Sequence, residues 1–150
     1  PRRCLRKGKN DMSIYRTFET DPQLEQEGIK LHYGFTNDGR PVKIRVARAG
    51  GANKRFAKIL EEESEPYRRA IETGQMDGRV ADEVMQRVYA RAIVLGWENV
   101  EDENDEPMEC TFDNVMKLFN DLPDLWHDLR TQAGKNALYR KNATKADSGN

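Results

Sequence analysis

Two runs of alternating apolar and polar residues on either side of a tight turn limit what this chain can fold into. Residues 29–35 place Ile, Leu, Tyr and Phe at every second position, and residues 42–46 do the same with Val, Ile and Val. A period of two is typical of a strand with one buried face. Between the runs lies Asn37-Asp38-Gly39, three residue types that accept left-handed backbone angles. The pattern predicts a β-hairpin over about residues 29–47.

A lone hairpin is marginal in water, so other elements must cover its apolar face. Most of the sequence after the hairpin has helical periodicity, with apolar residues three and four positions apart. Helices are expected to begin after the cap Asn53, near Gly78, after the cap Thr111 and at Pro123, with a break near Pro66 and an end at Gly96. The expected fold class is therefore α+β, mainly α, with the N-terminal hairpin packed on a bundle of four to five helices.

A chain of 150 residues is most simply one domain, because it is long enough to bury a sizeable core. Met12-Ser13-Ile14-Tyr15 is typical of a natural start, so residues 1–11 are expected to be a non-native or disordered leader. A basic disordered arm that binds nucleic acid is the alternative for this leader. Residues 12–140 are expected to form the single domain, and residues 141–150 a disordered tail.

Charge is distributed unevenly along the chain. Residues 97–128 contain eleven carboxylates and one lysine, and residues 98–109, the acidic loop, hold seven of those carboxylates. A protein that binds nucleic acid needs a basic face on its folded part, so we expect no nucleic-acid partner. No apolar run approaches the roughly 20 residues that span a bilayer, so we expect no membrane partner either.

No combination of residues predicts a reactive centre. His32 and His127 are isolated, and Cys4 and Cys110 are far apart, so metal-ligand spacing is absent. The Gly-rich stretch from Arg48 to Arg55 could attract an anion at a helix start, yet it lacks the spacing of a phosphate-binding loop. A tight strand-to-helix turn with solvated cations is the simpler interpretation. We expect no catalytic residue, no cofactor and no metal, and hence not an enzyme.

Three motifs carry a resemblance to a known family. They are RAGGANK at residues 48–54, GWENV at residues 96–100 and NDLPDLW at residues 120–126. Their order and spacing over roughly residues 28–140 resemble the tail assembly chaperones of long-tailed bacteriophages and prophages. This resemblance implies a small, acidic, mostly helical protein of the host cytoplasm that is absent from the mature virion. It also implies two partners, the tape measure protein, which the chaperone keeps soluble, and the tail tube protein, which it recruits.

The physical demands of such a role suggest where partners bind. A client with apolar seams needs an apolar groove between helices, flanked by charge. Self-association is also expected, head to tail. It would join the acidic loop of one copy to the Gly-rich turn of another, whose cations are Arg48, Lys54 and Arg55. The residues predicted to bind partners are Arg48, Lys54, Arg55, Trp97, Phe119, Leu122, Leu125 and Trp126. For any one of the apolar residues, a place in the core is the competing interpretation.

Two other functions remain open from the sequence. The chain could be another phage structural or tail accessory protein, for example one for tail completion. A small DNA-binding regulator would need a basic recognition helix, and the best helices here are acidic or apolar.

Overall fold

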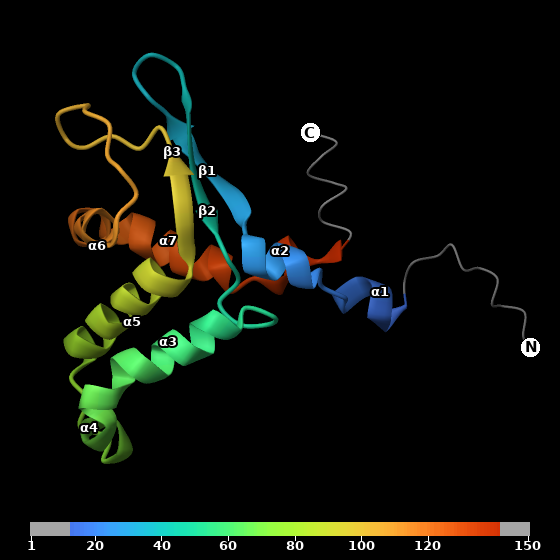
Figure 1. Ribbon diagram of the computed structural model, residues 1–150, viewed down its shortest axis with the longest axis vertical. Helices are drawn as coiled ribbons and strands as arrows, with labels where there is room; N and C mark the ends of the chain where they lie inside the picture. The colour runs from blue at the N-terminus through green and yellow to red at the C-terminus, as the bar shows by residue number, and fades with distance from the viewer. Residues whose placement is uncertain (1–12, 142–150) are drawn as a thin grey trace, which may run out of the picture.

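The computed structural model describes residues 13–141, which form a small sheet and a set of helices (Figure 1). Two short helices come first, followed by three strands interleaved with the longer helices. The elements in chain order are α1 (Ile14–Phe18), α2 (Pro22–Glu27), β1 (Ile29–Phe35), β2 (Pro41–Val46), α3 (Lys54–Ser64), the 3-10 turn η2 (Glu65–Tyr67), α4 (Arg68–Glu72), α5 (Gly78–Ala92), β3 (Val94–Glu98), α6 (Phe112–Asp121), α7 (Pro123–Ala133) and η3 (Asn136–Tyr139). The leader expected at residues 1–11 lies outside the described residues, and so does the tail expected at residues 141–150 except for Lys141. The backbone N–H of Lys141 donates to the carbonyl of Glu19 at 3.2 Å.

The predicted hairpin is present as β1 and β2. The two strands pair antiparallel, with Ile29 opposite Val46 and Leu31 opposite Ile44. Gly39 has a φ of 87°, which is the left-handed conformation expected of the turn. The α+β fold class, mainly α, is confirmed.

A third strand corrects the expected helix end at Gly96. α5 ends at Ala92, and β3 then pairs antiparallel with β2, placing Trp97 opposite Ile44. Ile93 still has helical backbone angles at the end of α5, and the β-branched Val94 begins the strand; both side chains are buried. The sheet order is β1-β2-β3, so β2, the second strand of the hairpin, is the central strand.

Most helix starts follow the caps that the sequence indicates. Thr111 Oγ accepts the backbone N–H of Asn114 at 3.2 Å, and Pro123 occupies the first turn of α7. Asn53 was expected to cap α3 and does not. Its side-chain amide instead donates to the carbonyl of Arg48 at 2.8 Å and that of Ala92 at 3.3 Å, because it is buried between the end of the sheet and α5.

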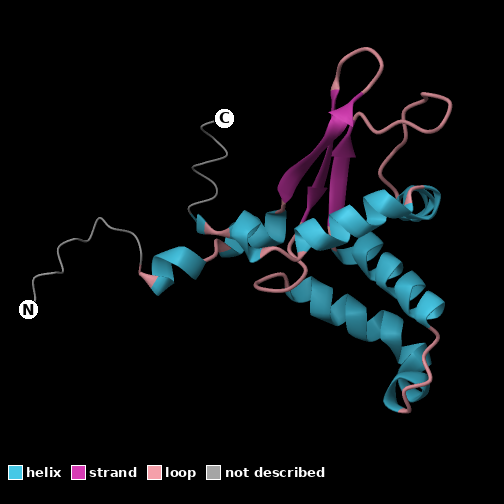
Figure 2. Ribbon diagram, turned by 180° about the vertical axis from the view of Figure 1, so that it is seen from behind, coloured by secondary structure: helices cyan, strands magenta, loops and turns pink. Residues whose placement is uncertain are grey.

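The helices form two groups around the sheet. Figures 1 and 2 show α3, α4 and α5 extending away from one end of the sheet, while α6 and α7 lie across the sheet near the same end. The aromatic centre of the core joins these groups: the ring centroid of Trp126 lies 5.1 Å from that of Tyr89 on α5 and 4.8 Å from that of Phe119 on α6. Trp126 Nε1 also donates to Asp82 Oδ1 at 3.1 Å.

The N-terminal helices are attached to the end of the described chain. Thr20 and Arg140 form an isolated antiparallel bridge, and the backbone N–H of Asp21 donates to the carbonyl of Tyr139 at 2.8 Å. Tyr139 is fully buried, and its hydroxyl donates to the carbonyl of Val46 at 3.1 Å. Residues near the two ends of the described chain therefore pack together beside Val46, the last residue of β2.

Within residues 13–141, no helix combines the length and the apolar character that crossing a membrane requires.

Candidate functional site

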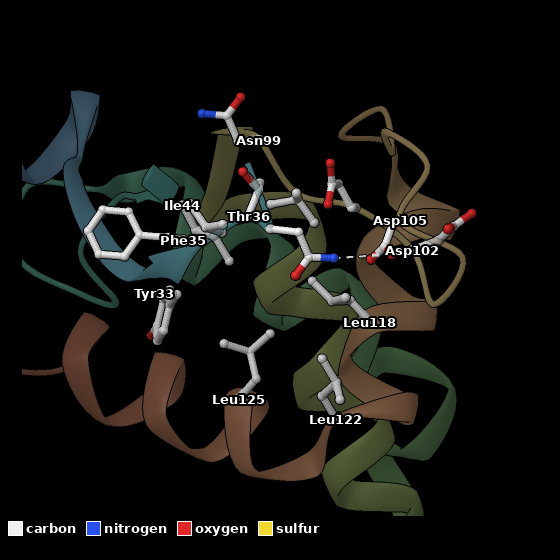
Figure 3. Close-up of a pocket in the computed structure, with 14 residues that line it drawn as sticks. Tyr33, Phe35, Thr36, Ile44, Asn99, Asp102, Asp105, Leu118, Leu122 and Leu125 are labelled. Atoms are coloured by element: carbon white, nitrogen blue, oxygen red, sulfur yellow. Dashed lines mark hydrogen bonds between the residues drawn. The ribbon is translucent and has the colours of Figure 1, made fainter. Parts of the chain in front are cut away.

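A groove lies between the sheet, the α6–α7 pair and the acidic loop, with a volume of about 390 Å³ (Figure 3). This volume falls within the range of about 300–1,000 Å³ that is usual for binding pockets. Its apolar lining comes from β1, β2, the acidic loop, α6 and α7, which are far apart in the sequence. The apolar lining residues are Tyr33, Phe35, Val42, Ile44, Val100, Leu118, Leu122 and Leu125.

The floor of the groove is formed by the period-two pattern of the hairpin. Val42 and Ile44 sit on alternate positions of β2, so their side chains point to the same face of the sheet, toward the helices. Ile44 is 2% exposed and belongs to the core. At the mouth, Phe35 is 67% exposed and Leu122 is 48% exposed, so large apolar side chains remain in contact with water.

The acidic loop forms one rim of the groove. Asp102 and Asp105 line it, and their hydrogen bonds in the described structure come from neutral donors. The backbone N–H groups of Glu106 and Asn104 hold the pKa of Asp102 below its usual value, so Asp102 is ionised at neutral pH. The side-chain amide of Asn37 donates to Asp105 at 3.3 Å. Asp102 and Asp105 therefore form no ion pair with another described residue.

Contacts from the hairpin and from α6 hold the loop in place. Arg40 joins Asp38 at 3.1 Å and Glu101 at 3.3 Å, tying the hairpin turn to the loop. Lys117 on α6 joins Glu103 at 3.1 Å. Because both sides of the loop are attached, the groove is a defined shape rather than a gap between segments.

The opposite wall is set by a hydrogen bond between β1 and α7. The hydroxyl of Tyr33 donates to Asp128 Oδ2 at 2.8 Å. Burial raises the pKa of Tyr33, and the hydrogen bond to the Asp128 carboxylate raises it further. The phenol therefore stays protonated and keeps donating, which fixes the spacing of sheet and helix.

Leu122 and Leu125 are the two predicted partner-binding residues that the structure brings together in this groove. Phe119 and Trp126, predicted alongside them, are each 1% exposed and lie in the core. The structure thus places both in the core, the competing interpretation of the sequence, where their ring centroids lie 4.8 Å apart. Their role in partner binding stays a prediction.

The Gly-rich turn, which carries the predicted cations Arg48, Lys54 and Arg55, lies apart from the groove. Arg48 forms an ion pair with Glu25, whose side chain is 3% exposed. Arg55 donates to the carbonyl of Arg91 at 3.0 and 3.2 Å. Lys54 is exposed at the start of α3. The Gly-rich turn is thus built around a buried carboxylate, Glu25, while Lys54 and Arg55 are both exposed.

Trp97 lies on β3 and is partly buried. Its indole N–H donates to the carbonyl of Met108 at 2.8 Å, which attaches the acidic loop to the sheet. Trp97 therefore positions the loop, and its role in partner binding stays a prediction.

Sequence reasoning missed Tyr33, Val42, Leu118 and the two rim carboxylates Asp102 and Asp105 as parts of one site. The alternation of β1 and β2 identified an apolar face, but only tertiary structure shows which helices cover it. Residues 13–141 contain no group of three or more His, Cys, Asp or Glu side chains placed to hold a metal ion. Burial raises the pKa of the Cys110 thiol, which disfavours the reactive thiolate.

Comparison with known proteins gives one family. Residues 51–150 match the profile of the YdaY prophage protein family. No curated protein and no solved structure matches the chain. The match includes α3 to α7, β3 and the acidic loop, while α1, α2 and the hairpin precede it.

Proposed function

This chain belongs to the YdaY prophage protein family, and we propose that it acts as a tail assembly chaperone. In this role it binds the tape measure protein, keeps it soluble and recruits tail tube subunits. It works in the cytoplasm of the bacterial host and is not part of the mature virion. The proposal contains no catalytic step, metal or cofactor.

The groove is the observation that carries this proposal. A tape measure protein is a long helical chain, and an isolated helix of that kind exposes an apolar seam to water. An amphipathic helix is recognised when its apolar side enters a groove lined by apolar side chains. The half-exposed Leu122 and the partly buried Leu125 offer such a lining, and Phe35 extends it at the mouth.

The acidic rim suits a chaperone that later releases its client. Exposed charges give contacts that are individually weak and screened by salt, so they steer and solubilise a complex without locking it. A client segment with basic residues beside its apolar seam is the best match for Asp102 and Asp105. The same negative rim repels phosphate groups, which supports a protein partner over a nucleic acid.

The resemblance of residues 48–54, 96–100 and 120–126 to tail assembly chaperones supports the same role, and a prophage family is consistent with it. In the structure, the segment 120–126 contributes Leu122 and Leu125 to the groove, and Trp97 of the segment 96–100 anchors its rim. Two of the three motifs therefore build one site.

Co-expression with the tape measure protein tests the proposal. Wild-type chain should increase the soluble fraction of the tape measure protein, and Leu122→Ser should reduce that increase several-fold. Ile71→Ser is the matched control, because Ile71 on α4 is also 48% exposed but lies outside the groove. Both variants should stay folded, with a free energy of unfolding within about 1 kcal/mol of wild type.

Three results would count against the chaperone role. The first is a Leu122→Ser variant that solubilises as well as wild type. The second is a tape measure protein that stays soluble on its own. The third is a mobility shift of duplex DNA at moderate salt, which would favour the regulatory alternative.

A further inference from the structure

A second pocket lies between the start of α5 and the end of α6, and its volume is about 380 Å³. It shares no lining residue with the groove. Apart from Val80, every residue that lines it has a polar or charged side chain. The lining residues are Asp77, Arg79, Val80, Asp82, Glu83, Gln86 and Asn120. Such a lining favours a polar or charged ligand over an apolar one.

Gln86 is the most buried residue of this lining, with 7% of its surface exposed. Its side-chain amide carries two N–H donors and a carbonyl oxygen. Within residues 13–141, nothing forms a hydrogen bond with that amide. Buried polar groups are almost always satisfied by the protein, by ordered water or by a ligand. Because Gln86 lines the pocket, a partner for its amide can enter from there.

Asn120, at the end of α6, supplies a second amide. Its side chain is exposed and forms no hydrogen bond with another residue of the described chain. α5 and α6 pack against each other, so Gln86 and Asn120 reach the pocket from two different helices. Rotation of an amide about its last side-chain bond exchanges oxygen and nitrogen. Both residues can therefore turn a carbonyl oxygen toward a ligand that donates hydrogen bonds.

Three carboxylates and one guanidinium group also line the pocket. Asp82 is committed in part, since it accepts from Trp126 Nε1 at 3.1 Å and lies 3.5 Å from Arg130. Asp77 caps the start of α5 through its side chain. Glu83 is exposed and forms no ion pair with any residue that the structure describes. The excess of carboxylates, and Glu83 in particular, favours a ligand with positive charge.

The acceptors match the shape of a guanidinium group. This group is planar, carries five N–H donors and is less strongly hydrated than an ammonium group. A carboxylate accepts two of those donors side by side. Glu83 and Gln86 are three positions apart on α5, so they lie on the same side of the helix. Glu83 can therefore take one edge of the group while the amide oxygens of Gln86 and Asn120 accept the remaining N–H groups.

We propose that this pocket binds a guanidinium group, held by Glu83, Gln86 and Asn120. The group belongs either to an arginine side chain of a polypeptide partner or to a small molecule, and the chemistry of recognition is the same. Arg79, four residues before Glu83, carries the same group and is an internal competitor for this carboxylate. The inference stands apart from the chaperone role, because it needs neither the groove nor the tape measure protein.

NMR spectra of the side-chain amide groups of the full chain test the proposal. Titration with N-acetyl-arginine amide should shift the signals of Gln86 and Asn120 until they saturate. N-acetyl-norleucine amide, which has no guanidinium group, should shift neither signal. N-acetyl-lysine amide should bind several-fold more weakly than the arginine probe, because its ammonium group lacks the planar fork. Equal affinity for the lysine probe would overturn the assignment to a guanidinium group.

Variants separate this pocket from general attraction to a charged surface. Glu83→Gln should weaken binding of N-acetyl-arginine amide roughly three-fold to five-fold. Glu109→Gln is the matched control, because it makes the same change of charge at an exposed residue outside the pocket, and it should bind like wild type. Arg79→Ala should strengthen binding about two-fold by removing the internal competitor. Equal losses for Glu83→Gln and Glu109→Gln would overturn the proposal.

The two amides are tested by Gln86→Leu and Asn120→Ala. Each should weaken binding of the arginine probe about two-fold or more, while circular dichroism shows a folded chain. Gln86→Leu removes an unpaired amide and keeps most of the side-chain volume, so the fold should tolerate it. Asn120 is exposed, and its replacement leaves the core untouched. Wild-type affinity of both folded variants would overturn the proposed contacts.

A short peptide with one arginine between alanines distinguishes the two sources of the group. Tighter binding of this peptide than of free arginine indicates a polypeptide partner, and the reverse order indicates a small molecule; both results support the site. If no arginine probe shifts the Gln86 signal, the proposal is wrong and water alone satisfies this amide.

Discussion

The Gly-rich turn and the groove are the two regions that the sequence marked for partner binding, and they differ in how they use charge. In the turn, the Arg48 guanidinium is paired with the buried Glu25. At the groove, Asp102 and Asp105 are hydrogen-bonded to neutral donors and form no ion pair with another described residue. A run of charged residues therefore does not by itself mark a binding surface. What matters is whether the fold supplies an internal counter-charge, and here a distant helix, α2, supplies one.

The largest expected effect concerns the core beneath the groove. Trp126→Ala should lower the free energy of unfolding by about 3–5 kcal/mol, because it removes a buried aromatic ring and leaves a cavity. Leu122→Ser, on the same stripe but half exposed, should cost about 1 kcal/mol or less. Urea denaturation followed by tryptophan-independent circular dichroism measures both. Equal losses would mean that Leu122 belongs to the core and that the groove is not a separate surface.

The second prediction tests whether the ion pair between Glu25 and Arg48 organises the Gly-rich turn. Glu25→Gln should lower the free energy of unfolding by about 3 kcal/mol, because it leaves Arg48 largely buried without a counter-charge. Glu25 also accepts the backbone N–H of Ala52 at 3.1 Å, so the turn itself should loosen. Glu65→Gln removes an exposed pair with Arg68 and is the matched control, with no measurable change expected. Wild-type stability of Glu25→Gln would show that the turn is not organised by this pair.

A smaller effect is expected in acid, at the ion pairs that join α3 to α5. Burial raises the pKa of Glu63, but hydrogen bonds from Arg87 and Arg91 outweigh it and leave the pKa below the usual value. The stabilisation is present above the unfolded-state pKa of about 4.3 and is lost as the pH falls through the lower folded-state pKa. Thermal unfolding from pH 6 down to pH 3 should therefore show a steeper loss for wild type than for Glu63→Gln. Parallel curves for the two proteins would contradict this.

The smallest expected effect tests whether the negative charge of the acidic rim contributes to self-association. Lys117 is paired with Glu103 and Asp121, so Lys117→Ala should make the acidic rim more negative. Self-association at low salt should strengthen by roughly two-fold, which is the size expected for one exposed pair. The difference should vanish at high salt, where the Debye length is short. Sedimentation velocity at two salt concentrations measures it, and an unchanged association constant at low salt would mean that rim charge plays no part.

Elements with a local signal were predictable from the sequence, and those that depend on distant pairing were not. The Asn37-Asp38-Gly39 turn, the cap Thr111 and the start at Pro123 each act within a few residues, so sequence alone located them. β3 was mistaken for the end of α5, since its strand character comes from pairing with β2 some fifty residues earlier. Nothing within residues 94–98 alone reveals that partner.

The residues of the groove could likewise be predicted only in part from local sequence. Leu122 and Leu125 were identified from helical spacing, but Phe119 and Trp126 share that spacing and face the core. Which of these two pairs faces the groove and which faces the core depends on how α6 and α7 are rotated about their own axes relative to the sheet. Likewise Asn53 has the residue type of a cap, yet burial turns its amide toward two carbonyls instead.

The bridge between Thr20 and Arg140 has a consequence for synthesis on the ribosome. The anchor of α1 and the hydrogen bond at the start of α2 both need Tyr139 and its neighbours, which are translated more than a hundred residues after them. Residues 14–27 therefore stay undocked during synthesis until Tyr139 and its neighbours have left the exit tunnel. Such a long sequence separation also predicts a late, slow step in folding, in which closure of the amino-terminal segment follows collapse of the helical core.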